Sequence, residues 1–170
     1  AIAAPREFYA QWLAPRLAAF RRAHPDITVQ LTADEEADFT EANLDLAIRL
    51  VEGPGDLEGA ILTGGCKVCV AAPDAPEGWI SWPTYEPPEG ARAVLTVGNA
   101  GQVLSSAIAG IGRAFLPLPL VEEALADGRL VMLGEPEDCR RAYWLLAPRP
   151  QWRQKKVRAL VEFLTAPAEV

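Results

Sequence analysis

Hydrophobic residues in this chain switch repeatedly between the two-residue spacing of a strand and the longer spacing of a helix. The segment 43–50, NLDLAIRL, shows one such switch, because apolar side chains fill alternate positions over Leu44–Ile48 directly behind Asn43. Asn is one of the few residues besides Gly that adopt the left-handed conformation closing a helix, so Asn43 predicts the end of a short polar helix over 35–43. A strand with large apolar residues on one face and small Ala47 on the other is typical of a sheet that is covered on both sides.

The same alternation continues along the chain and predicts an α/β fold with a largely parallel sheet. The first long helix, over 6–24, contains Pro15, which removes a backbone hydrogen bond, so we expect a kink there. Residues 73–90 are rich in proline and short aromatic pieces, and strand-helix alternation resumes at Ala93, so we expect a second α/β lobe. The predicted strands cover 1–4, 27–31, 44–48, 60–62, 67–72, 93–97, 113–116, 130–133 and 142–147, and the predicted helices cover 6–24, 35–43, 99–109, 120–126 and 151–165.

Composition narrows the function classes. Half of the 170 residues are hydrophobic, which is enough for one ample core or two small lobes. No apolar run approaches the ~20 residues that cross a membrane, and no secretory signal opens the chain, so we expect no membrane contact. Three cysteines are too few for a disulfide framework and favour a reducing, cytoplasmic location. The formal net charge of −7 argues against nucleic-acid binding by this chain itself, because phosphate neutralisation needs a basic face.

The sequence offers little support for catalysis or for a bound metal. His24, the only histidine, ends a predicted helix beside Pro25, which leaves no histidine for a Ser-His-acid triad. The chain contains no GxSxG, P-loop or GxGxxG motif. Cys66 and Cys69 have the spacing of a redox or zinc pair, but residues three apart on a strand point to opposite faces, and no second Cys or His pair completes a site. We therefore predict neither an enzyme nor a metal or cofactor.

Several stretches, taken in order, carry a resemblance to a known family. They are FYAQWLAPRL at 8–17, FRRAHPDI at 20–27, DFTEANLDLAIR at 38–49, AIAGIG at 107–112 with LP at 116–117, and ADGRLV at 126–131. Together they resemble the C-terminal effector-binding domain of LysR-type transcriptional regulators. In that family the position of Asn43 is usually Gly, which meets the same left-handed requirement another way. The resemblance covers nearly the whole chain but departs at 73–92, a shorter segment than usual, where one helix of the second lobe is expected to be missing.

The resemblance implies a bilobed, periplasmic-binding-protein-like (type 2) fold, in which two α/β subdomains are joined by two crossover strands with a ligand cleft between them. Subdomain I would comprise 1–71 and 147–170, and subdomain II would comprise 72–146. The family senses a small-molecule effector and assembles as a homodimer or homotetramer, pairing through the first helix and the strand after it. DNA would be contacted only through an N-terminal winged helix-turn-helix, which is absent from this sequence. The alternative function is an extracytoplasmic solute-binding protein of the same fold.

Several polar residues are placed to contact an effector, and most also have a structural explanation. Glu7 stands where the family usually has a Ser or Thr that bonds the effector, but an acid in a first helical turn is also stabilised by the dipole, by roughly 0.3–1 kcal/mol. Asn99 heads a second-lobe helix and could be its cap, a ligand contact, or both. Tyr143 could close the cleft with its hydroxyl or pack in the core. The candidate ligand-binding residues are Pro5, Glu7, Thr32, Arg49, Asn99 and Tyr143.

Overall fold

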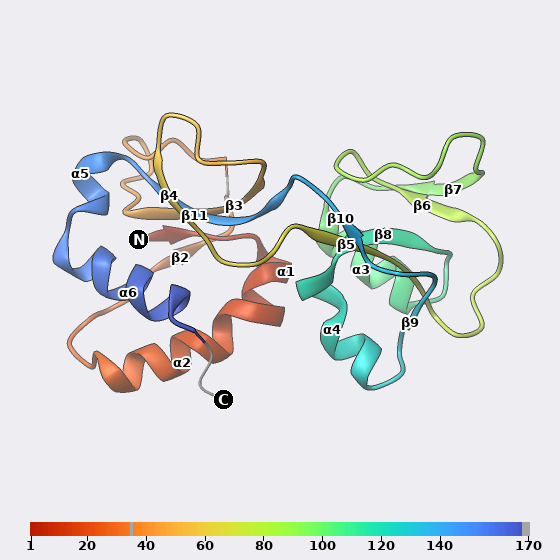
Figure 1. Ribbon diagram of the computed structural model, residues 1–170, viewed down its shortest axis with the longest axis horizontal. Coiled ribbons are helices and arrows are strands. Elements are labelled where there is room, and N and C mark those ends of the chain that lie inside the picture. Colours follow the sequence, from red (N-terminus) through yellow and green to blue (C-terminus); the bar gives the residue numbers. More distant parts are fainter. Residues whose placement is uncertain (35, 168–170) are drawn as a thin grey trace. The chain divides into compact units, whose positions relative to one another are not determined.

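The chain divides into two compact units, each with its own sheet, in a computed structural model that describes residues 1–34 and 36–167 (Figure 1). Unit 1 contains residues 1–65 and the chain from 140 onward, and unit 2 contains residues 66–139. The strand β5 (Cys66–Ala71) pairs with strands of unit 2, and β11 (Ala142–Ala147) pairs with strands of unit 1. The sequence predicts subdomain boundaries after residues 71 and 146, whereas the two units divide after residues 65 and 139. The boundaries differ because β5 pairs with strands of unit 2 and β11 pairs with strands of unit 1.

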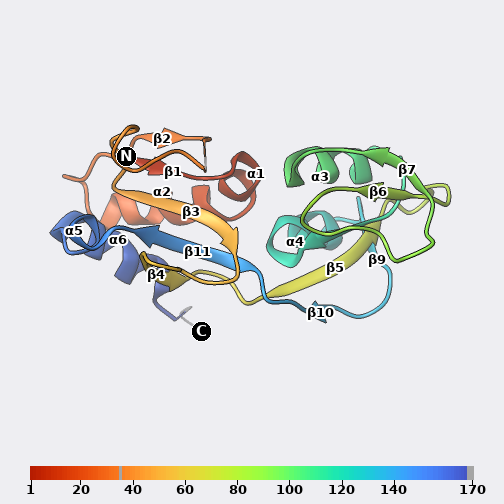
Figure 2. The same cartoon turned by 90° about the horizontal axis from the view of Figure 1, so that it is seen from above.

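The sheet of unit 1 has the strand order β2-β1-β3-β11-β4, which can be followed in Figure 2. β1 is parallel to both β2 and β3, whereas β11 is antiparallel to both β3 and β4. Four strands, β1 to β4, therefore run in the same direction, as expected of a largely parallel sheet, whereas β11 enters between β3 and β4 in the opposite direction. The remaining strands are β1 (Ile2–Ala3), β2 (Leu31–Thr32), β3 (Leu46–Val51) and β4 (Glu58–Ile61).

The strand expected over 27–31 is shorter and lies later than predicted, since regular pairing is limited to Leu31–Thr32. The segment before it still runs along β1, because the Ile2 amide donates to the Gln30 carbonyl at 2.8 Å. At the other end of the chain, the helix expected over 151–165 is divided in two. These helices are α5 (Arg149–Trp152) and α6 (Lys155–Thr165).

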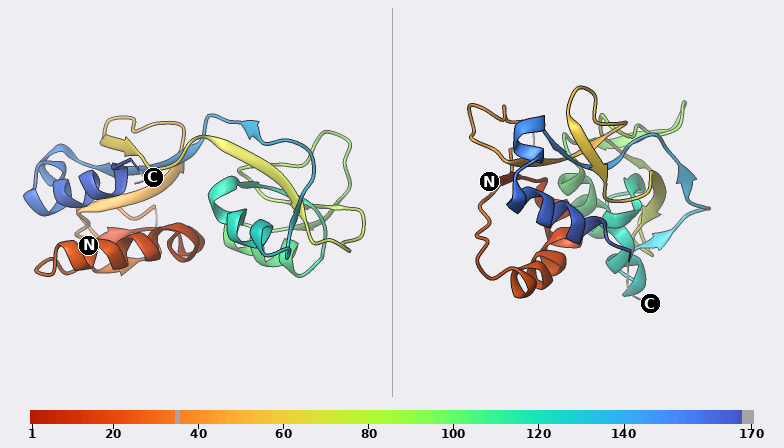
Figure 3. Two further views of the ribbon diagram at one scale, coloured as in Figure 1. Left: turned by 60° about the horizontal axis from the view of Figure 1, so that its bottom comes forward. Right: turned by 60° about the vertical axis from the view of Figure 1, so that its left-hand side comes forward.

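The first helix accommodates its internal proline with a π-helical stretch. Three segments follow one another without a break, and the ribbon is continuous in Figure 3. The Ala14 amide donates to the Tyr9 carbonyl, five residues earlier, just before Pro15 enters the next segment. Arg16 Nη1 donates to the Trp12 carbonyl at 2.8 Å, so a side chain supplies a donor beside the proline. The segments are α1 (Arg6–Phe8), η1 (Tyr9–Leu13) and α2 (Ala14–Ala23).

The short helix expected over 35–43 is a single turn in the described residues; Glu35 lies outside them. Asp38 Oδ1 caps its start by accepting from the Thr40 amide at 2.9 Å. Asn43 ends the turn with a φ of 51°, which confirms the expected left-handed conformation. The amides of Asn43 and of the next residue donate to the carbonyls three and five residues earlier, at 3.2 and 2.9 Å. This pair of bonds is the Schellman arrangement that closes helices.

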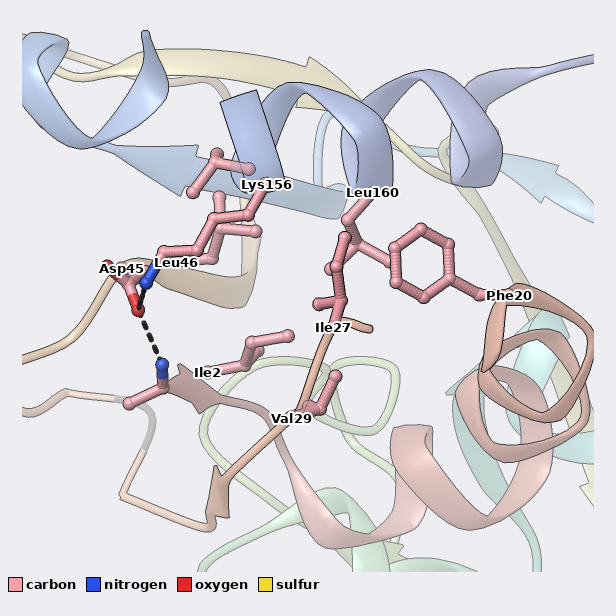
Figure 4. Close-up of a pocket in the computed structure, with 10 residues that line it drawn as sticks. Ile2, Phe20, Ile27, Val29, Asp45, Leu46, Lys156 and Leu160 are labelled. Carbon is pink, nitrogen blue, oxygen red and sulfur yellow. Dashed lines mark hydrogen bonds and ion pairs between the residues drawn. The ribbon is translucent and has the colours of Figure 1, made fainter. Parts of the chain in front are cut away.

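Both faces of the unit 1 sheet are covered, as the sequence predicts. On one face Leu46 lies beneath α2 and α6, where it shares a small pocket with Phe20 and Leu160 (Figure 4). On the other face Ala47 belongs to a buried cluster that packs against Phe39 of the single turn. Leu44 also belongs to this second cluster, not to the face of Leu46, because the strand begins only at Leu46 and the alternation does not extend back to residue 44.

Unit 2 is built around β5, to which β8, β9 and β10 all pair antiparallel. β6 and β7 form a separate parallel pair. The Ile80 amide of β6 donates to the Arg113 carbonyl at 2.8 Å, which joins this pair to the segment leading into β8. The elements are β6 (Trp79–Ser81), β7 (Ala93–Thr96), α3 (Ala100–Ile108), β8 (Ala114–Pro117), α4 (Leu118–Ala126), β9 (Val131–Met132) and β10 (Glu137–Asp138).

An irregular aromatic segment covers one face of β5 and β8. The described residues 73–92 contain no helix, as expected from their shortness. Trp82 Nε1 donates to the Phe115 carbonyl at 2.9 Å, and Tyr85 packs edge-on against Trp82 with ring centres 5.5 Å apart. Lys67 Nζ lies 4.7 Å from the centre of the Phe115 ring on the same face. Aromatic side chains thus cover the surface that a helix would otherwise cover, while α3 and α4 pack against this sheet with their own buried residues.

Candidate functional site

Three of the candidate residues meet at one edge of the unit 1 sheet. The strands β1, β2 and β3 are parallel, so their carboxyl ends lie at the same edge, with Ala3 opposite Thr32 on one side and Ala47 on the other. Pro5 follows the end of β1, Thr32 ends β2, and Arg49 lies two residues beyond the partner of Ala3. In α/β sheets, ligands bind beyond the carboxyl ends of the strands, so this edge is the best-placed part of unit 1 for a ligand.

Glu7 lies in the first turn of the helix that leaves this edge. The helix begins at Arg6, behind an extended Pro5, and no side chain caps its amino end. The first-turn amides of a helix have no partner within the helix, so this end presents free N–H groups. Glu7 is half-buried and makes no hydrogen bond or ion pair with another described residue. The structure therefore places an unpaired carboxylate and free backbone donors next to the edge.

Arg49 and Tyr143 are each held by contacts inside unit 1. Arg49 Nη2 donates to the Ala37 carbonyl at 3.2 Å, and its guanidinium lies 5.4 Å from the centre of the Phe39 ring. The Tyr143 ring stacks on Phe8 with centres 4.0 Å apart, and only 1% of the residue is exposed. These contacts favour a structural role: Arg49 holds the single turn against β3, and Tyr143 packs in the core.

Thr32 is the candidate beside an open pocket in unit 1. It is exposed, and its hydroxyl accepts from the Asp34 amide at 3.5 Å. A pocket of about 280 Å³ lies between this end of β2 and the left-handed turn. Its described lining residues include neither Glu7 nor Arg49, so the structure does not gather the candidates into one pocket. The lining residues are Ala1, Gln30, Leu31, Thr32, Ala42, Asn43 and Leu44.

Asn99, the candidate in unit 2, is the cap of α3. Its Oδ1 accepts from the Gln102 amide at 2.9 Å, and Gln102 Oε1 accepts in return from the Gly98 amide at 3.0 Å. The expected cap is confirmed by this reciprocal pair. Asn99 is exposed, and its side-chain amide nitrogen donates to no described residue. It also follows the carboxyl end of β7, so a ligand contact and the cap are compatible.

The apolar pocket beneath α2 and α6 is too small for an effector. Its volume is about 30 Å³, comparable with the space of one water molecule (Figure 4). At its rim, Asp45 Oδ2 lies 2.6 Å from the Ala1 nitrogen and 3.5 Å from Lys156 Nζ. Burial raises the pKa of Asp45, but the hydrogen bond and positive charge of Ala1, together with Lys156, outweigh this and hold that pKa below its usual range.

The sequence patterns did not indicate a second open pocket, which lies in unit 2. Its volume is about 340 Å³, within the range of small-molecule sites. One sequence feature could have indicated this pocket: Arg92 directly precedes β7 and Arg113 directly precedes β8, so each of these two strands begins beside a positive charge. The residues that line it are Glu77, Gly78, Trp79, Arg92 and Arg113.

Two of the cysteines, Cys66 and Cys69, have environments that disfavour a reactive thiolate. All three cysteines are free. Burial raises the pKa of Cys69 and, together with nearby Cys139 and Asp138, that of Cys66, so the nucleophilic thiolate is disfavoured at both. Within residues 1–34 and 36–167 no group of three His, Cys, Asp or Glu side chains is arranged to hold a metal ion. No helix in the same residues has the length and apolar character needed to span a membrane.

Two curated proteins are similar to this chain along most of its length. The AhcY transcriptional activator HvrB of Rhodobacter capsulatus is 28% identical over 98% of the chain, and the HTH-type transcriptional regulator TrpI of Pseudomonas aeruginosa is 29% identical over 84% of it. The chain spans 65% and 59% of the lengths of these two relatives. Both are transcriptional regulators, and neither supports the alternative of an extracytoplasmic solute-binding protein.

Solved structures confirm the expected fold. The AmpR effector binding domain from Citrobacter freundii matches with a TM-score of 0.83 at 19% identity, covering 96% of this chain and 94% of that one. The CrgA regulatory domain from Neisseria meningitidis matches with a TM-score of 0.76 at 17% identity, covering 96% and 95%. This is the periplasmic-binding-protein-like type 2 fold. The LysR substrate binding domain model matches residues 1–78 and 84–168, so the chain belongs to this family and is a LysR-type effector-binding domain.

Proposed function

We propose that this chain is the ligand-sensing part of a transcriptional regulator whose DNA contacts lie in an N-terminal winged helix-turn-helix outside the given sequence. The support is the family match, together with two relatives that are transcriptional regulators and are longer than this chain. The net charge of −7 fits a segment that does not itself hold phosphates. A mobility-shift assay of residues 1–170 with its own promoter at physiological salt should show no complex; sequence-specific binding would contradict this assignment.

The protein is proposed to be a cytoplasmic, non-enzymatic regulator that works as a homodimer or homotetramer. Its relatives are regulators and not enzymes, and the cysteines are free. The edge strand β2 carries Leu31 with 38% of its surface exposed, which is an apolar group at an unpaired strand edge. An edge of this kind, next to the first helix, is suited to pairing with a second copy.

The effector is proposed to bind at the carboxyl edge of the unit 1 strands. The observation that carries this is Glu7, an unpaired carboxylate beside free helix amides at the edge where Pro5 and Thr32 also lie. Glu7 also occupies the position where the family usually has an effector-bonding Ser or Thr. The proposed ligand contacts at this edge are Pro5, Glu7 and Thr32, whereas Arg49 and Tyr143 are engaged within unit 1 and Asn99 is a separate candidate in unit 2.

Glu7 also determines the class of effector. At ~4 Å and an effective dielectric of 20, two like charges cost roughly 4 kcal/mol. A hydrogen bond to a charged group stabilises binding by only about 1.5–3 kcal/mol. This is less than the repulsion energy, so a ligand carboxylate beside Glu7 would be repelled. No described residue neutralises Glu7, and Arg49 is engaged by the single turn. The proposed effector therefore presents a donor or a cation to Glu7, as an amine, an amide or a polyol does.

A thermal-shift screen of amines, polyols and carboxylates tests this site. An amine or polyol should stabilise the unmodified chain more than any simple carboxylate, and Glu7→Ser should remove or reverse that preference. Glu122→Ser, at an exposed position on α4 in unit 2, is the matched control and should leave the ranking unchanged. If a simple carboxylate stabilises the unmodified chain best and Glu7→Ser changes nothing, then Glu7 is only a helix-start acid.

A further inference from the structure

Neighbouring strand segments in unit 2 bring two arginines and a tryptophan together at their amino ends. β6 runs parallel to β7 with Trp79 opposite Ala93, and Trp79 forms a parallel bridge to Arg113 on its other side. The Trp79 amide donates to the Arg92 carbonyl at 2.9 Å, and the Arg113 amide donates to the Gly78 carbonyl at 3.0 Å. The backbone hydrogen bonds therefore fix Arg92, Trp79 and Arg113 side by side along one edge.

The pocket of about 340 Å³ opens at this edge and is lined by Gly78, which is in close contact with Gly112. A Cβ on Gly112 would lie 2.7 Å from the Gly78 carbonyl oxygen. Gly78 itself has a φ of 138°, and a Cβ there would lie 2.7 Å from a methyl carbon of Val94. Neither glycine can carry a side chain without a backbone shift, so the pocket wall at this point stays bare backbone.

Three charged groups line the pocket without neutralising one another. Arg113 is half-buried, with its guanidinium 5.8 Å from the centre of the Trp79 ring, while Arg92 and Glu77 are exposed. None of the three makes an ion pair with a described residue. Unpaired guanidiniums bind carboxylates through parallel N–H groups, and an indole face accepts flat or apolar groups. The pocket thus offers two positive groups, one negative group and one aromatic surface.

We propose that this pocket binds a small zwitterion of the amino-acid class. Its carboxylate would lie between Arg92 and Arg113, its ammonium group against Glu77 and its side chain on Trp79. A ligand with only negative groups meets repulsion from Glu77, and a ligand with only positive groups meets repulsion from the arginines. A ligand with one charge of each sign satisfies all three residues, which is why the zwitterion is favoured.

This second site shares no residue with the proposed effector contacts. Arg92 precedes the amino end of β7, whereas Asn99 lies beyond its carboxyl end and caps α3. The other proposed effector contacts belong to unit 1. A failure of the effector proposal at Glu7 would therefore leave this site intact, and the reverse also holds.

The test follows the Trp79 indole N–H signal by NMR in the 170-residue chain, with Trp79→Phe to assign it. The probes are L-phenylalanine, N-acetyl-L-phenylalanine, which lacks the ammonium group, and L-phenylalaninamide, which lacks the carboxylate. L-phenylalanine should shift the signal saturably with a Kd of about 1 mM, and each analogue should bind about tenfold more weakly. Glu77→Gln should weaken L-phenylalanine about tenfold and leave the acetylated probe no weaker.

Arginine variants supply the controls. The double variant Arg92→Gln with Arg113→Gln should abolish the response to L-phenylalanine. Arg129→Gln, which removes an exposed guanidinium elsewhere in unit 2, should leave it unchanged. The proposal is overturned if Trp79 does not respond to L-phenylalanine, if the acetylated probe binds as tightly, or if the double variant responds like the unmodified chain.

Discussion

Replacing Asn43 tests how a single backbone conformation supports the turn that leads into β3. Among the described residues Asn43 is the one non-glycine with a positive φ, at 51°. That conformation costs an ordinary L residue roughly 1–2 kcal/mol, and Asn tolerates it better than most. Gly adopts it freely but loses about 0.5–1 kcal/mol more chain entropy on folding. We expect Asn43→Ala to lower the free energy of unfolding by about 1 kcal/mol, and Asn43→Gly to change it by less than about 0.5 kcal/mol.

The turn cannot relax to a conformation that avoids the energy cost of a positive φ at residue 43. Asp38 caps its start, and Leu44, immediately after Asn43, is only 2% exposed in the cluster with Ala47. Rotating Asn43 to a negative φ would redirect the chain that carries Leu44 and break the two closing hydrogen bonds at 3.2 and 2.9 Å. The energy of the left-handed conformation should therefore appear almost fully in the measured stability.

Urea unfolding at neutral pH, followed by circular dichroism, measures both variants. The matched control is Ala42→Gly, because Ala42 is the exposed residue just before Asn43 and does not have a positive φ. There glycine should cost about 0.5–1 kcal/mol. Glycine should thus be tolerated at 43 and costly at 42. Equal losses in the two glycine variants, or an Asn43→Ala variant as stable as the unmodified chain, would refute the reasoning.

In the 170-residue chain, where the Ala1 amino group pairs with Asp45, Asp45→Asn should lower the free energy of unfolding by about 1 kcal/mol near pH 7. The folded-state pKa of Asp45 is lowered, so this stabilisation is present above the ordinary carboxyl pKa of about 4 and is lost as the pH falls through the folded-state pKa. In urea titrations at acid pH, the variant and the unmodified chain should therefore have the same free energy of unfolding. Asn99→Ala should cost about 1 kcal/mol through the lost cap of α3, while Asn99→Gly should cost only a few tenths. Sedimentation at high micromolar concentration should show a homodimer; a lone 18.4 kDa species would count against pairing through β2 and the first helix.

Structural features that depend only on residues adjacent in the sequence could be predicted. Asn43, with a φ of 51°, ends its turn in the expected left-handed conformation. Asn99 caps α3 as predicted, since a cap needs only the residues that follow it. The expected strand over 142–147 coincides with β11, because five of its six residues are apolar and buried, which leaves little freedom in its bounds.

Features set by distant partners could not be predicted. The position of β11 between β3 and β4 depends on strand pairing, which periodicity does not encode. Leu44 was expected on the face of Leu46, but where the strand begins depends on its hydrogen bonds to β1 and β11.

The candidate site shows the same limit. Arg49 and Tyr143 were selected for their positions, yet each is engaged by an aromatic residue far from it in sequence, Phe39 for Arg49 and Phe8 for Tyr143. The second pocket combines Glu77, Arg92 and Arg113, which the pairing of β6 with β7 and the bridge between Trp79 and Arg113 bring together.

Glu7 shows how an effector site can change its charge preference without a change of fold. A hydroxyl and a carboxylate are both acceptors suited to the first turn of a helix, and the dipole stabilises the carboxylate by roughly 0.3–1 kcal/mol. Glu7 is only half-buried, so its carboxylate keeps contact with water and its charge should cost little in folding. By contrast, the same charge makes binding of a ligand anion at ~4 Å less favourable by roughly 4 kcal/mol. A carboxylate in place of the family's usual Ser or Thr therefore acts almost entirely on ligand choice, which makes Glu7 the residue whose replacement should most change what this domain senses.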